Sequence, residues 1–347
     1  MKNVVLFTIS FLCVAAFAKI HTFSPEFQAI YDEAIKPEVR QAQRKGAEAK
    51  IVYRVVDDEG MPMTNTIVHG IWQNDYPRKT WKKKYVTDND GVFVAEQKIG
   101  GKFGCVVKKE GFYSSCDAVD FHWRKEVSPV LKDGKWQPYG ERRTLVVKRI
   151  KNPIDSSRLW YTVINVPSTN MWMGLDLGSF KWVKPFGDGV HADILLRFNS
   201  EPLNRYTVNW ATMEISFTNN MHGGFYVKKK DFYSEMKSEY CVDTNAVFNT
   251  GTIYRIGRDG KDDNILDKNH YMVFRTRTKV DETGNLISAH YGKIYGRWGI
   301  WGGTRAQLIF FNTNPNDINI EDLDASTRVR LKQNGLLNQD LTPSSFD

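Results

Sequence analysis

The sequence predicts a mainly β protein that consists of two antiparallel β-sandwiches preceded by a short helical arm. Short runs of β-branched and aromatic residues recur along the chain, and turns rich in Gly, Pro, Asn and Asp separate them. Aromatic residues, which favour strands, make up 13% of the chain. A length of 347 residues indicates about two domains. The hydrophobic and charged fractions, 41% and 25%, are those of an ordinary globular protein.

Residues 1–18 have the three parts of a secretory signal peptide. Lys2 supplies a positive charge, Val4 to Val14 forms an apolar run, and Ala16-Phe17-Ala18 is a small-x-small cleavage site. We expect cleavage after Ala18 and export to the periplasm, the cell surface or the medium. A buried N-terminal strand is the alternative. No later segment has about 18 uninterrupted apolar residues, so no transmembrane segment is expected in the mature chain.

Residues 19–49 are predicted to form the helical arm. Ser24-Pro25 has the form of an N-cap followed by Pro at the first helical position. Pro37 interrupts the pattern, and Gly46 is the expected end of a second short helix. The apolar positions of the first helix recur at helical spacing and are Phe27, Ile30, Tyr31 and Ala34.

Residues 50–152 are predicted to form the first sandwich. Gly60 and Gly91 suit turn positions that require a positive φ. Asp88 can accept a hydrogen bond from the backbone two residues further on. Phe93 fits the first inward position of the strand that follows this turn.

The segment from about residue 50 to 120 resembles a known domain family in three groups of residues. These are Asp57, Gly60 and Pro62; Thr87, Asp88, Gly91 and Phe93; and Lys109 to Tyr113. With them the segment resembles the carboxypeptidase regulatory-like domain, a transthyretin-like (prealbumin-type) sandwich of the immunoglobulin class. The resemblance implies an Ig-like fold for the first sandwich and the role of an accessory module, with almost no chemistry of its own.

Residues 153–320 are predicted to form a second, jelly-roll-like sandwich, followed by a polar tail at 321–347. We place the boundary at Lys151-Asn152-Pro153 because the strand pattern of Arg142 to Ile150 stops there. Eight strand runs are expected: Leu159 to Val166, His191 to Phe198, Tyr206 to Phe217, Phe225 to Lys229, Thr252 to Ile256, Tyr271 to Val280, Leu286 to Tyr295 and Gln307 to Phe311.

Two of these runs predict a hairpin. Asp281 to Asn285 separates them, with Gly284 expected in the left-handed position. In the first run apolar residues and threonines alternate with arginines, which indicates one buried and one solvated face. The alternating positions are Met272, Phe274, Thr276 and Thr278 against Arg275 and Arg277.

Three cysteines remain after removal of the signal peptide. In an oxidising compartment a disulfide is permitted, and an odd count leaves one thiol over. Cys105 and Cys116 flank the expected turn at Lys108 to Tyr113, so we expect them to pair across a hairpin and Cys241 to stay unpaired. Two buried, unpaired cysteines are the alternative.

The formal net charge is +8. An exported basic protein does not routinely meet nucleic acid, so the candidates are an anionic polysaccharide, lipid head groups or no specific partner. Of these, a glycan or an anionic cell-surface polymer is the expected kind of partner. The local runs are Lys82-Lys83-Lys84 and Lys228-Lys229-Lys230. A solvated strand edge that discourages strand pairing and a binding patch both account for such runs.

No standard catalytic, metal or cofactor motif is found in the sequence, and we predict no catalytic residue, metal or cofactor. Trp298 and Trp301, three residues apart among glycines, are the predicted ligand-binding residues, because flat rings beside Gly can present a surface to a sugar. The alternative is that both rings fill a core beside a tight turn. Trp172 and Trp182, which flank another Gly-containing segment, allow the same two interpretations.

These observations favour an exported, non-enzymatic β-sandwich protein that serves as a binding or structural component of a surface or envelope. The alternative is a carbohydrate-active enzyme whose first sandwich is an accessory domain. Glycoside hydrolysis requires two carboxyl groups at a defined separation across a cleft, which a sequence alone does not reveal.

Overall fold

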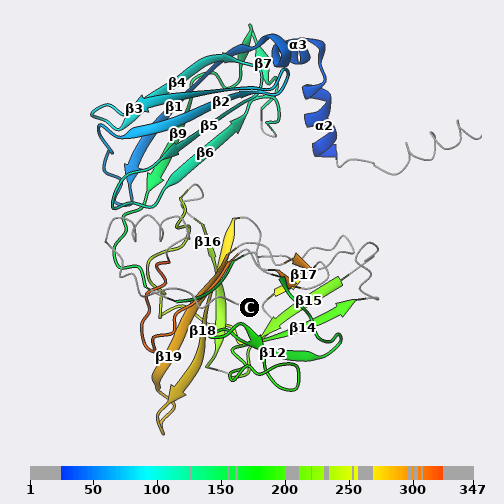
Figure 1. Cartoon of the computed structure of the whole chain (residues 1–347), viewed down its shortest axis with the longest axis vertical. Helices are drawn as coiled ribbons and strands as arrows, with labels where there is room; N and C mark the ends of the chain where they lie inside the picture. The colour runs from blue at the N-terminus through cyan, green and yellow to red at the C-terminus, as the bar shows by residue number, and fades with distance from the viewer. Residues whose placement is uncertain are drawn as a thin grey trace, which may run out of the picture. The chain divides into compact units, whose positions relative to one another are not determined.

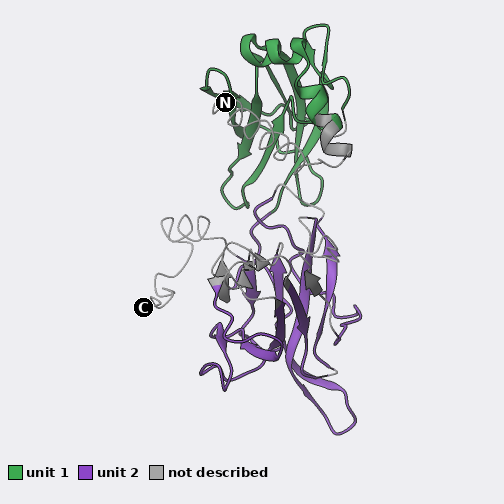
Figure 2. Cartoon of the chain, turned by 90° about the vertical axis from the view of Figure 1, so that its right-hand side faces the viewer, with its two compact units in different colours: residues 1–148 green, residues 149–347 purple. Residues whose placement is uncertain are grey.

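The computed structural model describes residues 25–124, 127–154, 156–160, 163–200, 211–219, 221–229, 234–251, 254–256, 269–295, 299–300, 304–305 and 308–322. The chain divides into two compact units, residues 1–148 and 149–347 (Figure 2). This division falls a few residues before the predicted boundary at residues 151–153. The predicted fold class is confirmed, because the chain is mainly β, most of its strands pair antiparallel, and the described residues begin with a short helical arm (Figure 1).

Two helices precede the first sandwich, α2 (Pro25–Ala34) and α3 (Pro37–Lys45). The first begins at Pro25, as the sequence predicts, and the second begins at Pro37, where the sequence pattern was expected to be interrupted. The backbone N–H of Gly46 closes α3 by donating to Ala42, at the predicted end of this helix. Helix α3 is part of the first unit, since its Val39 and Ala42 are buried in the core of that unit.

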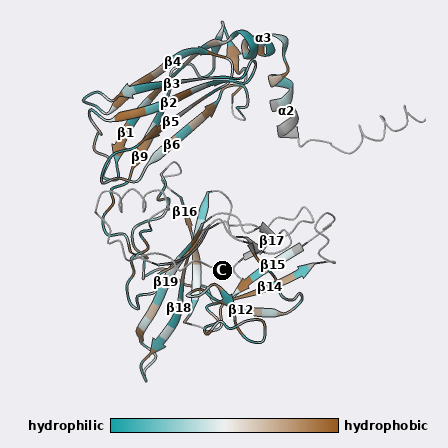
Figure 3. Ribbon diagram, in the orientation of Figure 1, coloured by the Kyte–Doolittle hydropathy of each residue, from teal (hydrophilic) through white to brown (hydrophobic). Residues whose placement is uncertain are grey.

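Two sheets form the first sandwich. One contains β4 (Val92–Ile99), β1 (Ala47–Asp57), β9 (Glu141–Val147), β8 (Lys135–Trp136) and β7 (Leu131–Lys132). The other has the order β3 (Lys79–Val86), β2 (Ile67–Asn74), β5 (Lys102–Val107) and β6 (Ser115–Asp120). All pairs within this second sheet are antiparallel, whereas β1 pairs in parallel with β8 and β9. Figure 3 shows hydrophobic and hydrophilic residues alternating along these strands.

The predicted turn chemistry is confirmed. Gly60 and Gly91 have φ values of 83° and 74°. Oδ1 of Asp88 accepts hydrogen bonds from the backbone N–H groups of Asp90 and Val92, at 3.0 and 2.8 Å. A side chain at Gly91 would place its Cβ 2.5 Å from the carbonyl oxygen of Val55, so this turn also requires the smallest residue.

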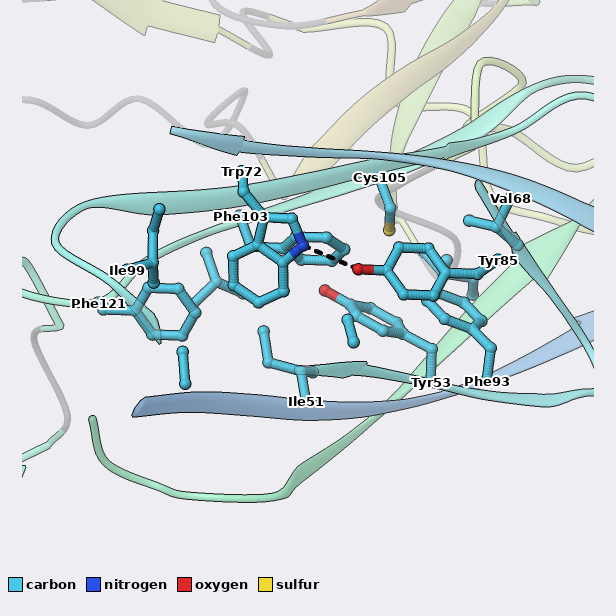
Figure 4. Packing of buried hydrophobic residues seen from close by; sticks show 14 of the residues in the cluster. Ile51, Tyr53, Val68, Trp72, Tyr85, Phe93, Ile99, Phe103, Cys105 and Phe121 are labelled. Atoms are coloured by element: carbon cyan, nitrogen blue, oxygen red, sulfur yellow. Dashed lines mark hydrogen bonds between the residues drawn. The ribbon is translucent and has the colours of Figure 1, made fainter. Parts of the chain in front are cut away.

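Aromatic rings from both sheets fill the space between them (Figure 4). Tyr53 stacks on Phe93 with ring centroids 5.0 Å apart, and Trp72 packs against Phe103 at 4.4 Å. The indole N–H of Trp72 donates to the hydroxyl of Tyr85 at 2.8 Å, so the polar atoms of both rings are satisfied inside the core.

Two five-stranded sheets form the second unit. One has the order β10 (Ser157–Trp160), β22 (Leu308–Phe311), β19 (Leu286–Tyr295), β18 (His270–Val280) and β16 (Gly223–Lys228). The other has the order β13 (Lys181–Trp182), β12 (Trp172–Asp176), β14 (Ile194–Ser200), β15 (Ala211–Ser216) and β17 (Tyr254–Ile256). A small third sheet contains β11 (Val163–Ile164), β21 (Thr304–Arg305) and β20 (Gly299–Ile300).

One hydrophobic cluster joins the two large sheets and establishes the sandwich. It combines Met272 and Phe274 of β18 with Leu196 of β14 and Ile215 of β15. The predicted hairpin between β18 and β19 is also confirmed, with Gly284 at φ 86°.

The sheet that contains β18 is buried on its second face as well. Tyr271 and Val273, which point away from the first cluster, pack in a separate cluster with Val242 and Ile320. The segments that supply Val242 and Ile320 lie outside the strands. The prediction of a solvated second face is therefore wrong for the first half of β18, because coil segments cover it.

Among the residues with described structure, no helix has both the length and the apolar character needed to cross a membrane.

Candidate functional site

The sheet of β3, β2, β5 and β6 buries one face against the core and leaves the other open to solvent. Because successive strand residues point to opposite faces, the second set of side chains on each strand forms this open face. We call it the outer face. Its residues are Thr80, Lys82, Lys84 and Val86; Ile67, His69, Ile71 and Gln73; Lys102, Gly104 and Val106; and Cys116, Ala118 and Asp120.

A shallow hollow of about 400 Å³ lies on the outer face, at the β2–β3 pair. The strand register shows which residues surround it. In one row across the sheet Ile71 lies between Lys82 and Gly104, and Ala118 follows Gly104. Since Gly104 has no side chain and Ala118 has only a methyl group, the surface is low on that side of Ile71. The hollow is lined by His69, Gly70, Ile71, Lys82, Lys83 and Lys84.

Gly70 positions this part of the sheet from the core side. A Cβ atom at residue 70 would lie 2.6 Å from the ring of Tyr85 on the neighbouring strand. The missing side chain lets Tyr85 lie across β2, where its hydroxyl accepts the hydrogen bond from Trp72. Contacts on the core side of β2 and β3 therefore hold the outer-face residues of these two strands in place.

The hollow is basic. Lys82, Lys83 and Lys84 are exposed, and among the described residues none of them forms an ion pair with a carboxylate. Lys83 points toward the core side of the edge and lies 5.1 Å from the centroid of the Tyr85 ring. The acidic residue of the outer face, Asp120, is at the far corner and pairs with Lys102 at 3.2 Å.

This arrangement can bind an anion. Lys82 and Lys84 supply two positive charges on strand neighbours of Ile71 and His69, above an apolar floor. The exposed apolar residues beside them are Ile67, Ile71 and Val86, with exposed fractions of 48%, 41% and 59%. A polymer with acidic groups and C–H faces would find complementary groups of both kinds.

The tryptophans singled out by the sequence do not contribute to this surface. Trp298 and Trp301 lie outside the described residues. Trp182 is buried, and its indole N–H donates to the carbonyl oxygen of Asn165 at 2.8 Å, so its role is structural. Trp172 is half-buried under the guanidinium group of Arg197.

The predicted disulfide between Cys105 and Cys116 is wrong. The two cysteines do lie on neighbouring strands, but the register pairs Cys105 with Asp117 and Cys116 with Val106. A one-residue offset between antiparallel strands sends the side chains to opposite faces. Cys105 points into the core (Figure 4). Cys116 is on the outer face, and no bond joins the two sulfurs.

One carboxylate pair in the second unit bears on the enzyme alternative. Asp176 and Asp193 both bind the guanidinium group of Arg277, at 2.8 Å. Burial alone would raise the pKa of Asp176. Hydrogen bonds from three backbone N–H groups and the charge of Arg277 have the larger combined effect, so the pKa of Asp176 lies below its ordinary value. A glycosidase acid needs the opposite shift, so this pair has the character of a structural ion pair.

Sequence reasoning found the lysines of the hollow but missed His69, Ile71 and Gly104. The run from Ile67 to Asn74 does contain a signal for His69 and Ile71. Val68, Gly70 and Trp72 alternate with them and point inward, which leaves His69 and Ile71 on the outer face. The pairing of β2 with β5, which brings Gly104 beside Ile71, depends on contacts distant in sequence and has no local signal.

No family model matches the chain, and no curated protein matches it. Solved structures match it at low identity. A 3-chlorocatechol 1,2-dioxygenase from Rhodococcus opacus 1CP is 15% identical over 31% of this chain and 61% of its own, with a TM-score of 0.24. A protein from Bacteroides uniformis ATCC 8492 that is proposed to bind carbohydrate is 10% identical over 79% of this chain and 100% of its own, with a TM-score of 0.18. A streptococcal ancillary pilin is 9% identical over 80% of this chain and 62% of its own, with a TM-score of 0.21.

This chain spans less than two thirds of the length of the dioxygenase. Likenesses of this size assign neither a family nor a function to the chain. The resemblance of residues 50–120 to the carboxypeptidase regulatory-like domain stays a prediction.

Proposed function

We propose that this protein is an exported, non-enzymatic component of a cell surface or envelope, and that it binds an anionic polysaccharide through the outer face of its first sandwich. Export rests on the signal-peptide pattern of residues 1–18. An accessory-type first sandwich, as implied by the carboxypeptidase regulatory-like resemblance, agrees with a binding role.

The observation that carries the proposal is the pairing of Lys82 and Lys84 with Ile71 and His69 on an open sheet face. Two cations in register on one strand are separated by two residues, or about 6.6–6.8 Å along an extended strand. A chain of acidic sugars that lies along β3 can place its negative groups near both of them, while the C–H faces of its rings cover Ile71.

The strand-edge explanation of the same lysines is compatible with binding but predicts something different. β3 is an edge strand of its sheet, so Lys82, Lys83 and Lys84 also discourage pairing with another chain. If edge protection were their sole role, their loss would promote self-association without a change in polymer affinity.

A double variant, Lys82→Ala with Lys84→Ala, separates these roles. Its affinity for polygalacturonate, a polymer of acidic sugars, should fall about 2- to 30-fold, since each exposed ionic contact contributes about 0.2–1 kcal/mol. Binding is measured by isothermal titration calorimetry at low and at physiological salt, and screening should weaken it. Analytical ultracentrifugation of the same variant reports self-association.

The matched control removes two exposed lysines from the other sheet, Lys98→Ala with Lys132→Ala. Both double variants lose the same net charge, so an equal loss of affinity would show that only overall charge matters and would contradict a site on the outer face. Uncharged dextran tests the requirement for acid groups, and equal binding of both polymers would also contradict the proposal.

A further inference from the structure

A lysine side chain is buried completely in the second unit. Lys293 of β19 has a side-chain exposure of 0%, and its Nζ lies 4.9 and 5.1 Å from the ring centroids of Tyr295 and Phe310. Removal of an ammonium group from water is costly unless partners compensate it. The partners of this lysine therefore decide its chemistry.

Three oxygen atoms surround Nζ of Lys293. It donates to Oδ1 of Asp322 at 2.5 Å, to the carbonyl oxygen of Ile320 at 2.5 Å and to Oγ of Ser238 at 2.7 Å. Asp322 is itself buried, with a side-chain exposure of 7%. Since Oδ1 is bonded to Cγ, these distances leave Nζ within about 3.8 Å of Cγ, close to the ~3–3.5 Å of a near-attack arrangement.

We propose that Lys293 and Asp322 condense into an amide bond that joins β19 covalently to the segment after β22. The reaction begins with transfer of one proton from the Lys293 ammonium group to Oδ1 of Asp322. A neutral amine and a neutral carboxylic acid result.

The amine nitrogen then attacks Cγ of Asp322, and the new C–N bond forms. One N–H proton passes to the leaving oxygen, the C–O bond breaks, and one water molecule departs. The product is a neutral secondary amide, so atoms and charge balance without an oxidant or any other reagent. Oγ of Ser238, already hydrogen-bonded to Nζ, is placed to relay the proton.

Tyr295 provides a second neutral hydrogen-bonding group at this place. Burial, followed by the charge of Asp322, raises the pKa of Tyr295 well above its ordinary value. Its phenol therefore stays protonated. The adjacent acidic residue, Glu321, does not take part, because its carboxylate accepts the backbone N–H groups of Lys151 and Asn152.

Peptide mapping of the folded full chain tests the proposal directly. Trypsin does not cleave after an acylated lysine, so digestion under denaturing conditions should yield peptide 280–297 uncleaved at Lys293 and joined to peptide 306–328. The joined species should be lighter than the sum of the two peptides by one water molecule. Normal cleavage after Lys293, with peptide 306–328 at its unmodified mass, would overturn the proposal and leave a buried ion pair.

Two variants at residue 322 test whether Asp322 is the residue that bonds to Lys293. Asp322→Asn should lose ammonia instead of water and give a linked peptide of the same mass as the parent protein. Asp322→Ala should give two separate peptides with normal cleavage after Lys293. A linked species in the Asp322→Ala variant would assign the bond to another residue and contradict the proposal.

Discussion

Arg277 binds Asp193 across the second sandwich through two hydrogen bonds, Nε to Oδ1 and Nη2 to Oδ2, each at 2.8 Å. Arg277 belongs to β18 of one sheet, and Asp193 immediately precedes β14 of the other. Arg277 has φ 50° at a β-bulge between β18 and β19. The irregular backbone turns the guanidinium group inward, so that it also reaches Asp176 at 2.8 Å.

Loss of this guanidinium group should therefore destabilise the second unit strongly. Arg277→Ala leaves two buried carboxylates without a counter-charge, and removal of one partner from a buried ion pair costs about 3–5 kcal/mol. Hydrogen exchange followed by mass spectrometry across a urea series reports the two units separately. Arg197→Ala is the control, because Arg197 pairs with Glu214 at a more exposed position and should cost about 0–1 kcal/mol. Equal effects of the two variants would contradict the structural role of Arg277.

Gly91 and Gly60 make a matched pair in the first unit, because both have a positive φ. An alanine at either position costs about 1–2 kcal/mol of backbone strain. A Cβ atom at residue 60 meets nothing within 4 Å, whereas at residue 91 it lies 2.5 Å from the oxygen of Val55. Gly91→Ala should thus reduce the free energy of unfolding by a further ~1–3 kcal/mol relative to Gly60→Ala. Urea unfolding of both variants checks this, and equal losses would contradict the close approach.

Glu33 should make the first unit less stable in acid. Burial raises the pKa of Glu33, but hydrogen bonds from Lys36, the backbone N–H of Val130 and Ser128 lower it more, to below its ordinary value of 4.5. A carboxyl group whose pKa is lowered by folding stabilises the folded state above pH 4.5, and this contribution disappears as pH falls through the folded pKa. The stability difference between the parent protein and Glu33→Gln should therefore be present at neutral pH and vanish in acid. Glu38→Gln, at an exposed position on α3, is the control, and an equal pH-dependent difference for both variants would contradict the role of Glu33.

The three cysteines should react with iodoacetamide at different rates. Burial, followed by the charge of Asp117, raises the pKa of Cys105 to about 12. A buried thiol with so little thiolate should be alkylated only after unfolding, whereas the exposed Cys116 and Cys241 react in the folded protein. Peptide mapping after timed labelling identifies each site. A disulfide-linked Cys105–Cys116 peptide from unreduced protein would contradict the register of β5 and β6.

Local signals predicted much of this fold. Residues close in sequence predicted the start of the first helix at Pro25 and the end of the second at Gly46. They also predicted the Gly turns at residues 60, 91 and 284 and a strand in each of the eight runs of the second unit. The strand β12 was missed, since its Trp and Gly residues also suit a ligand surface. Pairing partners could not be predicted, because the parallel contact of β1 with β9 joins residues about ninety positions apart.

For the candidate site too, features set by residues close in sequence were predicted, whereas features set by contacts between distant residues were not. The lysine run is visible in the sequence, and its position on an edge strand is one of the two predicted explanations. The disulfide prediction failed on a single step of register, which no pattern within either strand determines. The second covered face of β18 was missed because residues that cover it, such as Val242 and Ile320, lie in segments without a period.

That coil layer has a practical consequence for labelling and engineering. Loops usually accept an inserted tag, because they carry little of the core. Here Val242 and Ile320 belong to the core although their segments have no regular structure. A tag inserted between residues 240 and 242 should leave the chain insoluble. The same tag at the exposed tip between β18 and β19, residues 282–284, should leave the unit folded and the tag accessible to solvent.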